Sequence, residues 1–308
     1  MSAAFSLRHR RGRPARRARQ RLSRAGSISG VSVINSLRSG VGWISQHNPI
    51  ARDLIKSAKA RRLSLLSKSR NAEFVRLHPG EPMPPLDMMA DANAHCDYRK
   101  YYESGLFQAR FYRDMFGRHV DFDRSPPVMI FEWGCGPGRI VRHLRRLYEP
   151  GAVEIRASDY NPAAVEWCAN AFPDIAFFRN DVAPPLDLRD DSIDIAYCSS
   201  VFTHLTDGLC RQWMQELKRV VRPGGLISFT IAGQSFAYRY HEFERDAYRR
   251  GISVYHEWDE VGRRDFFAWH PPQYVRSVFL SGLEELEYVS SEDSRLNQDL
   301  WLARVPRH

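Results

Sequence analysis

The pattern of apolar and polar positions changes its period along the chain, and each change marks the border of an element. An apolar run at 128–133 follows Pro127 and leads into a glycine-rich turn. Apolar residues then recur at helical spacing over 139–147, and a second apolar run occupies 153–157. Short apolar runs bounded by turn residues predict strands, whereas a period near 3.6 predicts a helix. The order therefore predicts a βαβ unit.

The alternation of strands and helices continues towards the C-terminus. Further strands are predicted over 175–178, 193–198 and 226–231, with helices after Pro162 and over 210–221. The second of these helices has its apolar side chains on one side and ends before the turn at 223–225. Such an order predicts an α/β fold in which helices cover both faces of a mostly parallel sheet. Ligands of such folds bind at the carboxyl ends of the strands.

The N-terminal part of the chain follows a different pattern. The stretch 8–24 is rich in Arg and has no acid, so charge repulsion predicts a disordered segment. Apolar residues between 31 and 66 recur at helical spacing, but the helix breakers Gly40, Gly42 and Pro49 interrupt them. This pattern predicts short basic amphipathic helices with weak packing.

Four prolines at 79–85 indicate a linker, so we divide the chain into a basic leader, 1–85, and an α/β domain, 86–308. The charge supports this division. Residues 1–70 contain fourteen Arg and three Lys against one acid, Asp53, a net charge of +16, whereas the remainder carries −7 and the whole chain +9. The basic character therefore belongs to the leader.

Several roles are compatible with a basic leader: a solvated tail, contact with anionic lipid, nucleic-acid binding, or an Arg-rich transit peptide. A wrongly assigned start codon would also produce it. Because the basic charge accompanies interrupted amphipathic helices, we favour a tail or weak contact with an anionic membrane over nucleic acid.

Cysteine usage and hydropathy indicate the compartment. The five cysteines are widely spaced and form no C-x-x-C pair, so we expect no disulfide framework and no metal site. No run of 18 apolar residues occurs, and the N-terminus lacks the apolar core of a secretory signal. We expect a cytoplasmic protein, with a peripheral place at the inner face of the membrane as an alternative.

The most informative string is FEWGCGPG at 131–138, which places Gly134, Gly136 and Gly138 directly after a strand and before a helix. Glycines at this position allow a tight turn and the close approach of a ligand. A dinucleotide-binding turn would need a small residue where Arg139 stands, and Pro137 removes a backbone donor. The turn therefore favours S-adenosylmethionine, an adenosine ligand without phosphate, over a pyrophosphate ligand.

Polar residues follow the next two strands. Asp159 stands where a carboxylate accepts hydrogen bonds from both ribose hydroxyls, and its neighbour Tyr160 can pack on adenine. After the third strand, the triplet Asn180, Asp181 and Val182 offers a carboxylate to the adenine amino group and a backbone amide to a ring nitrogen. Asp181 is also a favoured turn residue before a proline pair, so a purely structural role stays open.

The strings FEWGCGPGR, SDYNP, NDVAPP, DIAYCSSVFTHL and ELKRVVRPGG, in this order, resemble the motifs of class I S-adenosylmethionine-dependent methyltransferases. The resemblance covers about 127–231, and within the family it is similar to bacterial methyltransferases of surface glycans or small molecules. It implies a Rossmann-like sheet of seven strands that ends in an antiparallel hairpin, here 283–289 and 299–305. It also implies cofactor contacts for Glu132 and Cys135, with Glu132 orienting the amino group of the cofactor; capping of the following helix is the alternative for Glu132. Ser199 follows the fourth strand, and from this position we expect it close to the transferable methyl.

His204 is the catalytic candidate, because a neutral imidazole near the end of the fourth strand can take a proton from a substrate hydroxyl. A role in capping the next helix or in contacting the cofactor is the alternative. The long segment 232–270 is rich in aromatic and ionisable residues, and we expect it to cover the acceptor. By analogy with the family, Tyr101 and Tyr102 close the cofactor pocket from the N-terminal side.

The sequence thus predicts an enzyme that transfers a methyl group from S-adenosylmethionine to an acceptor, a small molecule or glycan. An oxygen of a sugar-like or small-metabolite substrate is the favoured target. The alternatives are an RNA methyltransferase or nucleic-acid-binding module that uses the basic leader, and a nucleotide-dependent oxidoreductase. The net charge of −7 outside residues 1–70 argues against broad phosphate contact there. The oligomeric state is not predicted.

Overall fold

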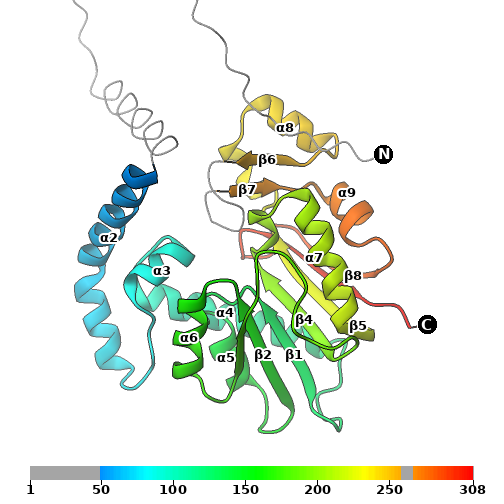
Figure 1. Ribbon diagram of the computed structural model, residues 1–308, viewed down its shortest axis with the longest axis horizontal. Helices are drawn as coiled ribbons and strands as arrows, with labels where there is room; N and C mark the ends of the chain where they lie inside the picture. The colour runs from blue at the N-terminus through cyan, green and yellow to red at the C-terminus, as the bar shows by residue number, and fades with distance from the viewer. Residues whose placement is uncertain (1–48, 258–265, 308) are drawn as a thin grey trace, which may run out of the picture.

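The computed structural model describes residues 49–257 and 266–307, and its centre is a seven-stranded sheet (Figure 1). The strands lie in the order β3-β2-β1-β4-β5-β9-β8. Their bounds are β1 Val128–Trp133, β2 Val153–Asp159, β3 Ala176–Arg179, β4 Ile193–Ser199, β5 Val221–Ile231, β8 Glu284–Val289 and β9 Asp299–Arg304. The first five are mutually parallel, and β9 pairs antiparallel with both β5 and β8. The predicted sheet and its C-terminal antiparallel hairpin are confirmed.

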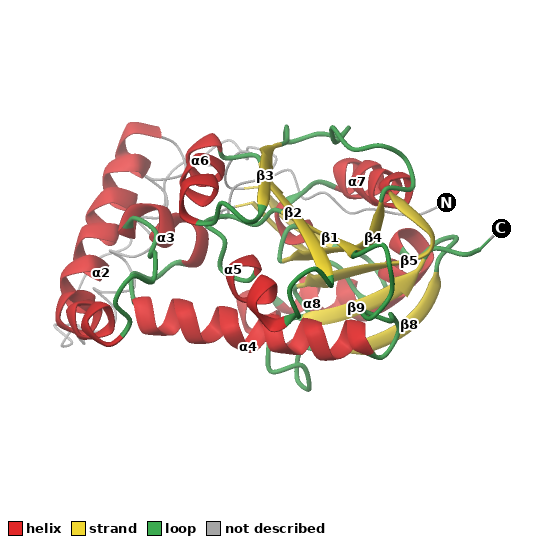
Figure 2. Cartoon of the chain, turned by 90° about the horizontal axis from the view of Figure 1, so that it is seen from below, coloured by secondary structure: helices red, strands yellow, loops and turns green. Residues whose placement is uncertain are grey.

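The apolar strand runs bury side chains on both faces of the sheet, as expected for parallel strands covered by helices. In β1, Phe131 and Trp133 belong to one apolar core, whereas Val128 and Ile130 belong to the other. The first core includes α7 (Asp207–Val220), α9 (Pro272–Tyr274) and η4 (Val275–Phe279). The second includes α4 (Tyr98–Gly117), α5 (Val141–Leu144) and α6 (Pro162–Ala171). Figure 2 shows α4 and α7 on opposite sides of the sheet.

The strand order determines where a ligand can bind. Strand β1 pairs with β2 on one side and with β4 on the other, so the chain leaves the centre of the sheet in two opposite directions. In open α/β sheets, such a point leaves a crevice at the carboxyl ends of the strands. Glu132 sits in β1 at this point and pairs in register with Ala157 of β2 and Tyr197 of β4.

The N-terminal part differs from the prediction. One continuous helix, α2, spans Pro49–Leu77, whereas the pattern predicted short interrupted helices. No Gly or Pro lies within 50–77, and Pro49 stands at the first helical position, where its missing amide hydrogen costs nothing. The rest of that prediction falls at 31–48, and the predicted disorder at 8–24; both lie outside the described residues. No helix in the described part is long and apolar enough to cross a membrane.

The end of α2, beyond the stretch 31–66 for which weak packing was expected, packs against the globular body. Asn71 is buried and bridges two backbone groups: its Nδ2 donates to the Cys96 carbonyl at 2.8 Å, and its Oδ1 accepts from the Tyr98 amide at 3.0 Å. Phe74 is 1% exposed and its ring lies 5.5 Å from that of Tyr102. The short helix α3 (Leu86–Asn93) follows. The boundary at 85/86 itself stays a prediction.

The segment 232–270 folds as a small unit of its own. It contains η3 (Gln234–Arg239), α8 (Glu242–Arg249) and an antiparallel pair of strands, β6 (Val254–Glu257) and β7 (Phe266–Trp269). The ring of Trp269 stacks between Tyr240 and Tyr248, with centroids 4.2 and 3.8 Å away. Figure 1 shows α8, β6 and β7 gathered at one end of the molecule.

Candidate active site

The glycine turn after β1 is held against the end of β2. The Gly134 and Cys135 amides both donate to the Ser158 carbonyl, at 2.8 and 2.9 Å. The Gly136 amide donates to Oδ2 of Asp159 at 2.7 Å. The three glycines of the turn have φ values of 73°, 51° and 71°, in the left-handed region that residues with a Cβ rarely adopt. The predicted motif and the predicted acid therefore meet in one hydrogen-bonded unit.

Close packing adds a second requirement for glycine at two of these positions. A Cβ on Gly134 would lie 2.4 Å from Val201 Cγ2, and one on Gly138 would lie 3.2 Å from the Cys168 sulfur. At Gly136 the nearest atom to such a Cβ is that of Ala92 in α3, at an ordinary 3.8 Å. Gly134 and Gly138 thus let the turn pack on its neighbours, while Gly136 lies beneath the end of α3.

Asp159 is buried, with 6% exposure, and each of its oxygens accepts a backbone amide: Oδ2 from Gly136 and Oδ1 from Asn161 at 2.9 Å. Burial raises its pKa above the ordinary value, and the nearby carboxylate of Asp91 in α3 raises it further, while the amide hydrogen bonds oppose the rise. The two amides fix the orientation of the carboxylate. Each oxygen has a second lone pair that can accept a ribose hydroxyl.

Glu132, in β1 two positions before Gly134, is 2% exposed, and its Oε2 accepts the Tyr197 hydroxyl at 2.8 Å. Burial raises its pKa to about 8, against the hydrogen bond from Tyr197 and the positive charge of Arg139, which lower it. A bound ammonium group would compensate the cost of ionising a carboxyl group in this place.

The loop after β3 holds Asn180, Asp181 and Val182 in different surroundings. Asn180 is buried. Its backbone amide donates to the Asp159 carbonyl at 3.2 Å, and its side-chain Nδ2 donates to the Asp181 carbonyl at 2.7 Å. Its Oδ1 is buried without a hydrogen-bond partner in the protein. The Asp181 side chain is 86% exposed and lies 3.9 Å from Arg179. The Val182 carbonyl accepts the Trp213 indole at 2.8 Å, which holds the loop on α7.

A polar network that the sequence did not reveal lies beyond Ser199, the last residue of β4. The Ser200 amide donates to Oγ1 of Thr230 at 2.9 Å, and Gln298 Nε2 donates to the Ser200 hydroxyl at 2.7 Å. Thr230 in turn donates to Gln298 Oε1 at 2.6 Å. Because Gln298 is 98 positions from Ser200, no local sequence signal could have linked them.

Tyr160, which directly follows β2 and is predicted to pack on adenine, is 36% exposed.

His204 connects the sheet to the segment 232–270. It ends the short helix η2 (Phe202–His204), and its Nδ1 lies 2.8 Å from the Phe266 carbonyl oxygen of β7. A carbonyl oxygen only accepts, so Nδ1 carries the hydrogen, and in the neutral ring the lone pair is on Nε2. This tautomer is the one that a base acting through Nε2 requires.

Two further residues hold the glycine turn. The Tyr101 hydroxyl, fully buried, donates to the Pro137 carbonyl at 2.8 Å. Arg142 is 1% exposed; its Nε donates to the Gly138 carbonyl at 3.1 Å and its Nη1 to that of Pro82 at 2.8 Å. Its guanidinium lies over the rings of Tyr101, Trp167 and Phe172, at 5.3, 5.5 and 4.8 Å. Arg142 was missed because an arginine near a helix start ordinarily indicates a solvated position.

These features fit a cationic adenosine ligand. One buried acid precedes the glycine turn, a second is hydrogen-bonded to it at Gly136, and the buried Oδ1 of Asn180 is an acceptor still to be satisfied. A pyrophosphate would meet carboxylates here, whereas a sulfonium and an ammonium are attracted. In the part of the chain that is described, no group of three or more His, Cys, Asp or Glu side chains is placed to hold a metal ion.

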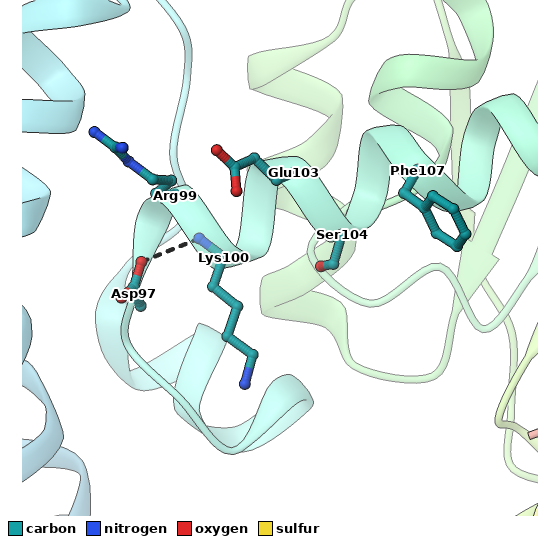
Figure 3. A pocket seen from close by; sticks show the side chains of 6 residues that line it. All are labelled: Asp97, Arg99, Lys100, Glu103, Ser104 and Phe107. Carbon is teal, nitrogen blue, oxygen red and sulfur yellow. Dashed lines mark hydrogen bonds between the residues drawn. The ribbon is translucent and has the colours of Figure 1, made fainter. Parts of the chain in front are cut away.

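An open pocket of about 440 Å³ lies elsewhere, along the first half of α4 (Figure 3). Its lining consists of Asp97, Arg99, Lys100, Glu103, Ser104 and Phe107. Asp97 begins the helix, and its carboxylate accepts the Lys100 amide at 3.0 Å. None of the site residues predicted from the sequence lines this pocket. The candidate active site is therefore assigned by the carboxyl ends of β1, β2 and β4, not by this hollow.

Comparison with known proteins identifies the domain. Residues 130–225 match the model of the methyltransferase domain family. The chain therefore carries a class I S-adenosylmethionine-dependent methyltransferase domain, and S-adenosylmethionine is the cofactor of that family. The cofactor predicted from the glycine turn is confirmed, and the oxidoreductase alternative receives no support.

The curated relatives resemble this domain rather than the whole chain. A malonyl-[acyl-carrier protein] O-methyltransferase of a Paenibacillus species is 32% identical over 148 residues, 43% of this chain and 52% of the relative. A tRNA(Thr) cytosine N(3)-methyltransferase of Saccharomyces cerevisiae is 32% identical over 35% of this chain and 19% of its own length. This chain thus spans about half of the first relative and a fifth of the second.

A solved methyltransferase structure from Methanosarcina mazei covers 63% of this chain and 98% of its own. The two share 17% identity, with a TM-score of 0.47.

Proposed function

We propose that this chain transfers the methyl group of S-adenosylmethionine to an oxygen of a sugar-like or small-metabolite acceptor. The observation that carries methyl transfer is the joined glycine turn and Asp159, because the 2.7 Å bond from the Gly136 amide sets the carboxylate at the switch point of the sheet. The name of the Paenibacillus relative, an O-methyltransferase, supports an oxygen acceptor. The yeast relative is named as a methyltransferase of a tRNA nitrogen. The names of the relatives therefore differ in their acceptors, and the oxygen acceptor is part of this proposal.

The residues of the chain would hold the two ends of the cofactor differently. Glu132 receives the ammonium of the methionine part, Asp159 the ribose hydroxyls, and Asn180, Asp181 and Val182 the adenine. Gly134, Cys135, Gly136 and Gly138 form the floor, with Tyr160 against adenine and Ser199 near the reacting end. When bound, the cofactor supplies a methyl group made electrophilic by its sulfonium. The protein contributes alignment of the acceptor with that methyl.

The acceptor would lie between the sheet and the segment 232–270. His204 links the two through its hydrogen bond to the Phe266 carbonyl, which leaves Nε2 as the nitrogen through which a neutral ring would take the proton of an acceptor hydroxyl. The ring of Phe267 lies 6.4 Å from that of His204 and offers a face on which a sugar or planar metabolite can stack.

The cofactor assignment is tested by ligand-induced stabilisation of the full-length chain. S-adenosylhomocysteine, at about 100 times its dissociation constant, should add about 2.7 kcal/mol to the free energy of unfolding. The Asp159→Ala variant should lose this stabilisation, while Asp174→Ala, which removes an exposed surface carboxylate, should keep it. NADH should have no effect. A rise with NADH, or an undiminished rise in Asp159→Ala, contradicts the proposed site.

The role of His204 is tested separately. His204→Ala should lower turnover by about 10²- to 10⁴-fold, the usual contribution of a positioned base, with the affinity for S-adenosylhomocysteine nearly unchanged. Unaltered turnover on an accepted substrate would remove the base role. A parallel loss of cofactor affinity would assign His204 to cofactor binding instead.

A peripheral membrane contact is the second part of the proposal and rests on α2. Leu54 and Leu65 are 66% and 74% exposed and share one side of the helix with Arg61 and Arg76, which are also exposed. Exposed leucines among basic residues suit an anionic bilayer surface. The full-length chain should sediment with vesicles that contain phosphatidylglycerol, and Leu65→Glu should abolish this. Equal binding to neutral vesicles would contradict the charge argument.

RNA is the competing partner for the same basic helix, favoured by the name of the yeast relative. If RNA binds, the logarithm of the affinity should fall steeply and linearly with the logarithm of salt concentration. Specific methylation of an RNA by the full-length chain would replace the small-metabolite acceptor.

A further inference from the structure

Arg239, the last residue of η3, has its guanidinium among the aromatic rings of the segment 232–270. Its Cζ atom lies 5.4 Å from the ring centroid of Phe236, 5.9 Å from that of Tyr238 and 5.5 Å from that of Phe267. The Phe236 and Phe267 rings are 5.6 Å apart, so η3 and β7 build this aromatic surface together. The attraction between a guanidinium and ring faces holds the side chain in place without using its N–H groups.

The Arg239 guanidinium has no carboxylate partner. Across 49–257 and 266–307 it makes neither an ion pair nor a side-chain hydrogen bond, and the residue is exposed. Two arginines of the neighbouring helix α8 differ in this respect, since Arg245 and Arg249 both contact Glu242, at 2.6 and 2.7 Å. A guanidinium carries five N–H donors in a planar fork that matches a carboxylate or a phosphate. All five donors of Arg239 are therefore available to an anion.

Phe267 connects Arg239 to the candidate base. Its ring lies 6.4 Å from that of His204, and the carbonyl of the preceding residue, Phe266, lies 2.8 Å from His204 Nδ1. The imidazole and the guanidinium thus both contact one aromatic residue of β7. A small acceptor that touches Phe267 can reach the imidazole with one group and the guanidinium with another.

We infer that Arg239 binds an anionic group of the methyl acceptor, a carboxylate or a phosphate, and that the acceptor is an acidic small molecule such as a sugar acid or a sugar phosphate. The inference rests on the proposed function, which places the acceptor between the sheet and the segment 232–270, and it adds the charge of that acceptor. Because residues 71–308 carry a net charge of −7, an anionic acceptor needs a local cation of this kind. Phe236 and Tyr238 orient the guanidinium, whose planar fork can form two parallel hydrogen bonds to the anion.

Saturation-transfer NMR titrations of the full-length chain with S-adenosylhomocysteine present test this role without a known acceptor. The probes are benzoate, phenyl phosphate and benzamide, which place a carboxylate, a phosphate or a neutral amide beside the same planar ring. The native chain should bind at least one anion about tenfold more tightly than benzamide, and the preferred anion distinguishes a carboxylate acceptor from a phosphate acceptor. Arg239→Gln should weaken that anion by about tenfold, the effect of one charge-assisted hydrogen bond, and leave benzamide within about twofold. Arg239→Lys should give a smaller loss, because it keeps the charge without the fork.

Arg250→Gln is the matched control, because Arg250 is an exposed arginine of the same segment whose guanidinium contacts no ring and no carboxylate of the described residues. It should change none of the affinities. Circular dichroism of the unliganded variants tests for folding. If the native chain does not prefer either anion to benzamide, or if Arg239→Gln binds the anions as the native chain does, the inference is overturned. Failure of the native chain to bind S-adenosylhomocysteine would instead contradict the proposed function.

Discussion

At the scale of single residues, the site depends on an acid kept in an environment that disfavours its charge. Glu132 is 2% exposed between β2 and β4, and its hydrogen bond to Tyr197 does not outweigh burial, so its pKa is raised to about 8. The cofactor's ammonium would reverse this balance by favouring the ionised form. Cofactor binding should therefore release protons near neutral pH.

The raised pKa of Glu132 implies that the stability of the folded chain depends on pH. Between pH 4.5, the ordinary pKa, and about 8, the folded chain holds a proton on Glu132 that the unfolded chain has released. Raising the pH through this window therefore favours unfolding. Without cofactor, Glu132→Gln should have a melting temperature close to the native one near pH 4.5 and an increasingly higher one towards pH 8. Parallel profiles across this range, measured by calorimetry, would contradict the raised pKa.

At the scale of elements, helix α4 is positioned by a close contact with the segment that follows the glycine turn. Gly105→Ala would place a Cβ 2.0 Å from the Arg139 carbonyl oxygen, so we expect a loss of about 1–3 kcal/mol from overpacking. Gly117→Ala, at the end of the same helix, meets no atom within 4 Å and is the control. Urea unfolding should separate the two variants; equal stabilities would show that α4 can shift freely.

The elements that sequence periodicity predicted well are those buried on two sides. The strands and helices of 128–231 carry apolar runs whose period is set by the sheet, so their order could be derived. The terminal hairpin was expected from the resemblance to the family. Strand β5 begins at Val221, earlier than predicted, and it includes Gly224 and Gly225, which were expected in a turn before the strand. The hairpin of β6 and β7 was not predicted, since its strands are four residues long and aromatic positions there serve local packing.

For the site, motifs located Gly134, Gly136, Gly138 and Asp159, because each follows a strand and the strand ends converge. Contacts between residues far apart in the sequence could not be predicted from motifs. The bonds of Arg142 to Pro82 and of Gln298 to Ser200 join residues 60 and 98 positions apart. Asp181 was assigned by its motif, and the structure places its side chain in solvent, so its contact with adenine stays a prediction.

At the scale of the whole molecule, Asn71 helps to fasten the N-terminal helix to the domain, beside the buried ring of Phe74. Asn71→Ala removes two buried hydrogen bonds, to Cys96 and Tyr98, and leaves their backbone groups unsatisfied. We expect a loss of about 1–3 kcal/mol of stability. Ser69→Ala, exposed on the same helix, should be neutral. Chemical denaturation with fluorescence detection measures both, and a neutral Asn71→Ala would mean that the two hydrogen bonds of Asn71 contribute nothing to stability.

Arg142 connects the proline-rich segment 79–85 to the glycine turn, although the composition of that segment indicates only a linker. The same guanidinium that holds the Gly138 carbonyl also holds Pro82, and Glu81 pairs with Arg146 at 2.7 Å. A stretch that a protein engineer would choose for grafting a tag or another domain is thus mechanically continuous with the cofactor turn. An insertion at Gly80 should weaken cofactor binding. An insertion at the exposed Gly151, where a Cβ would likewise meet no atom within 4 Å, should leave cofactor binding unchanged.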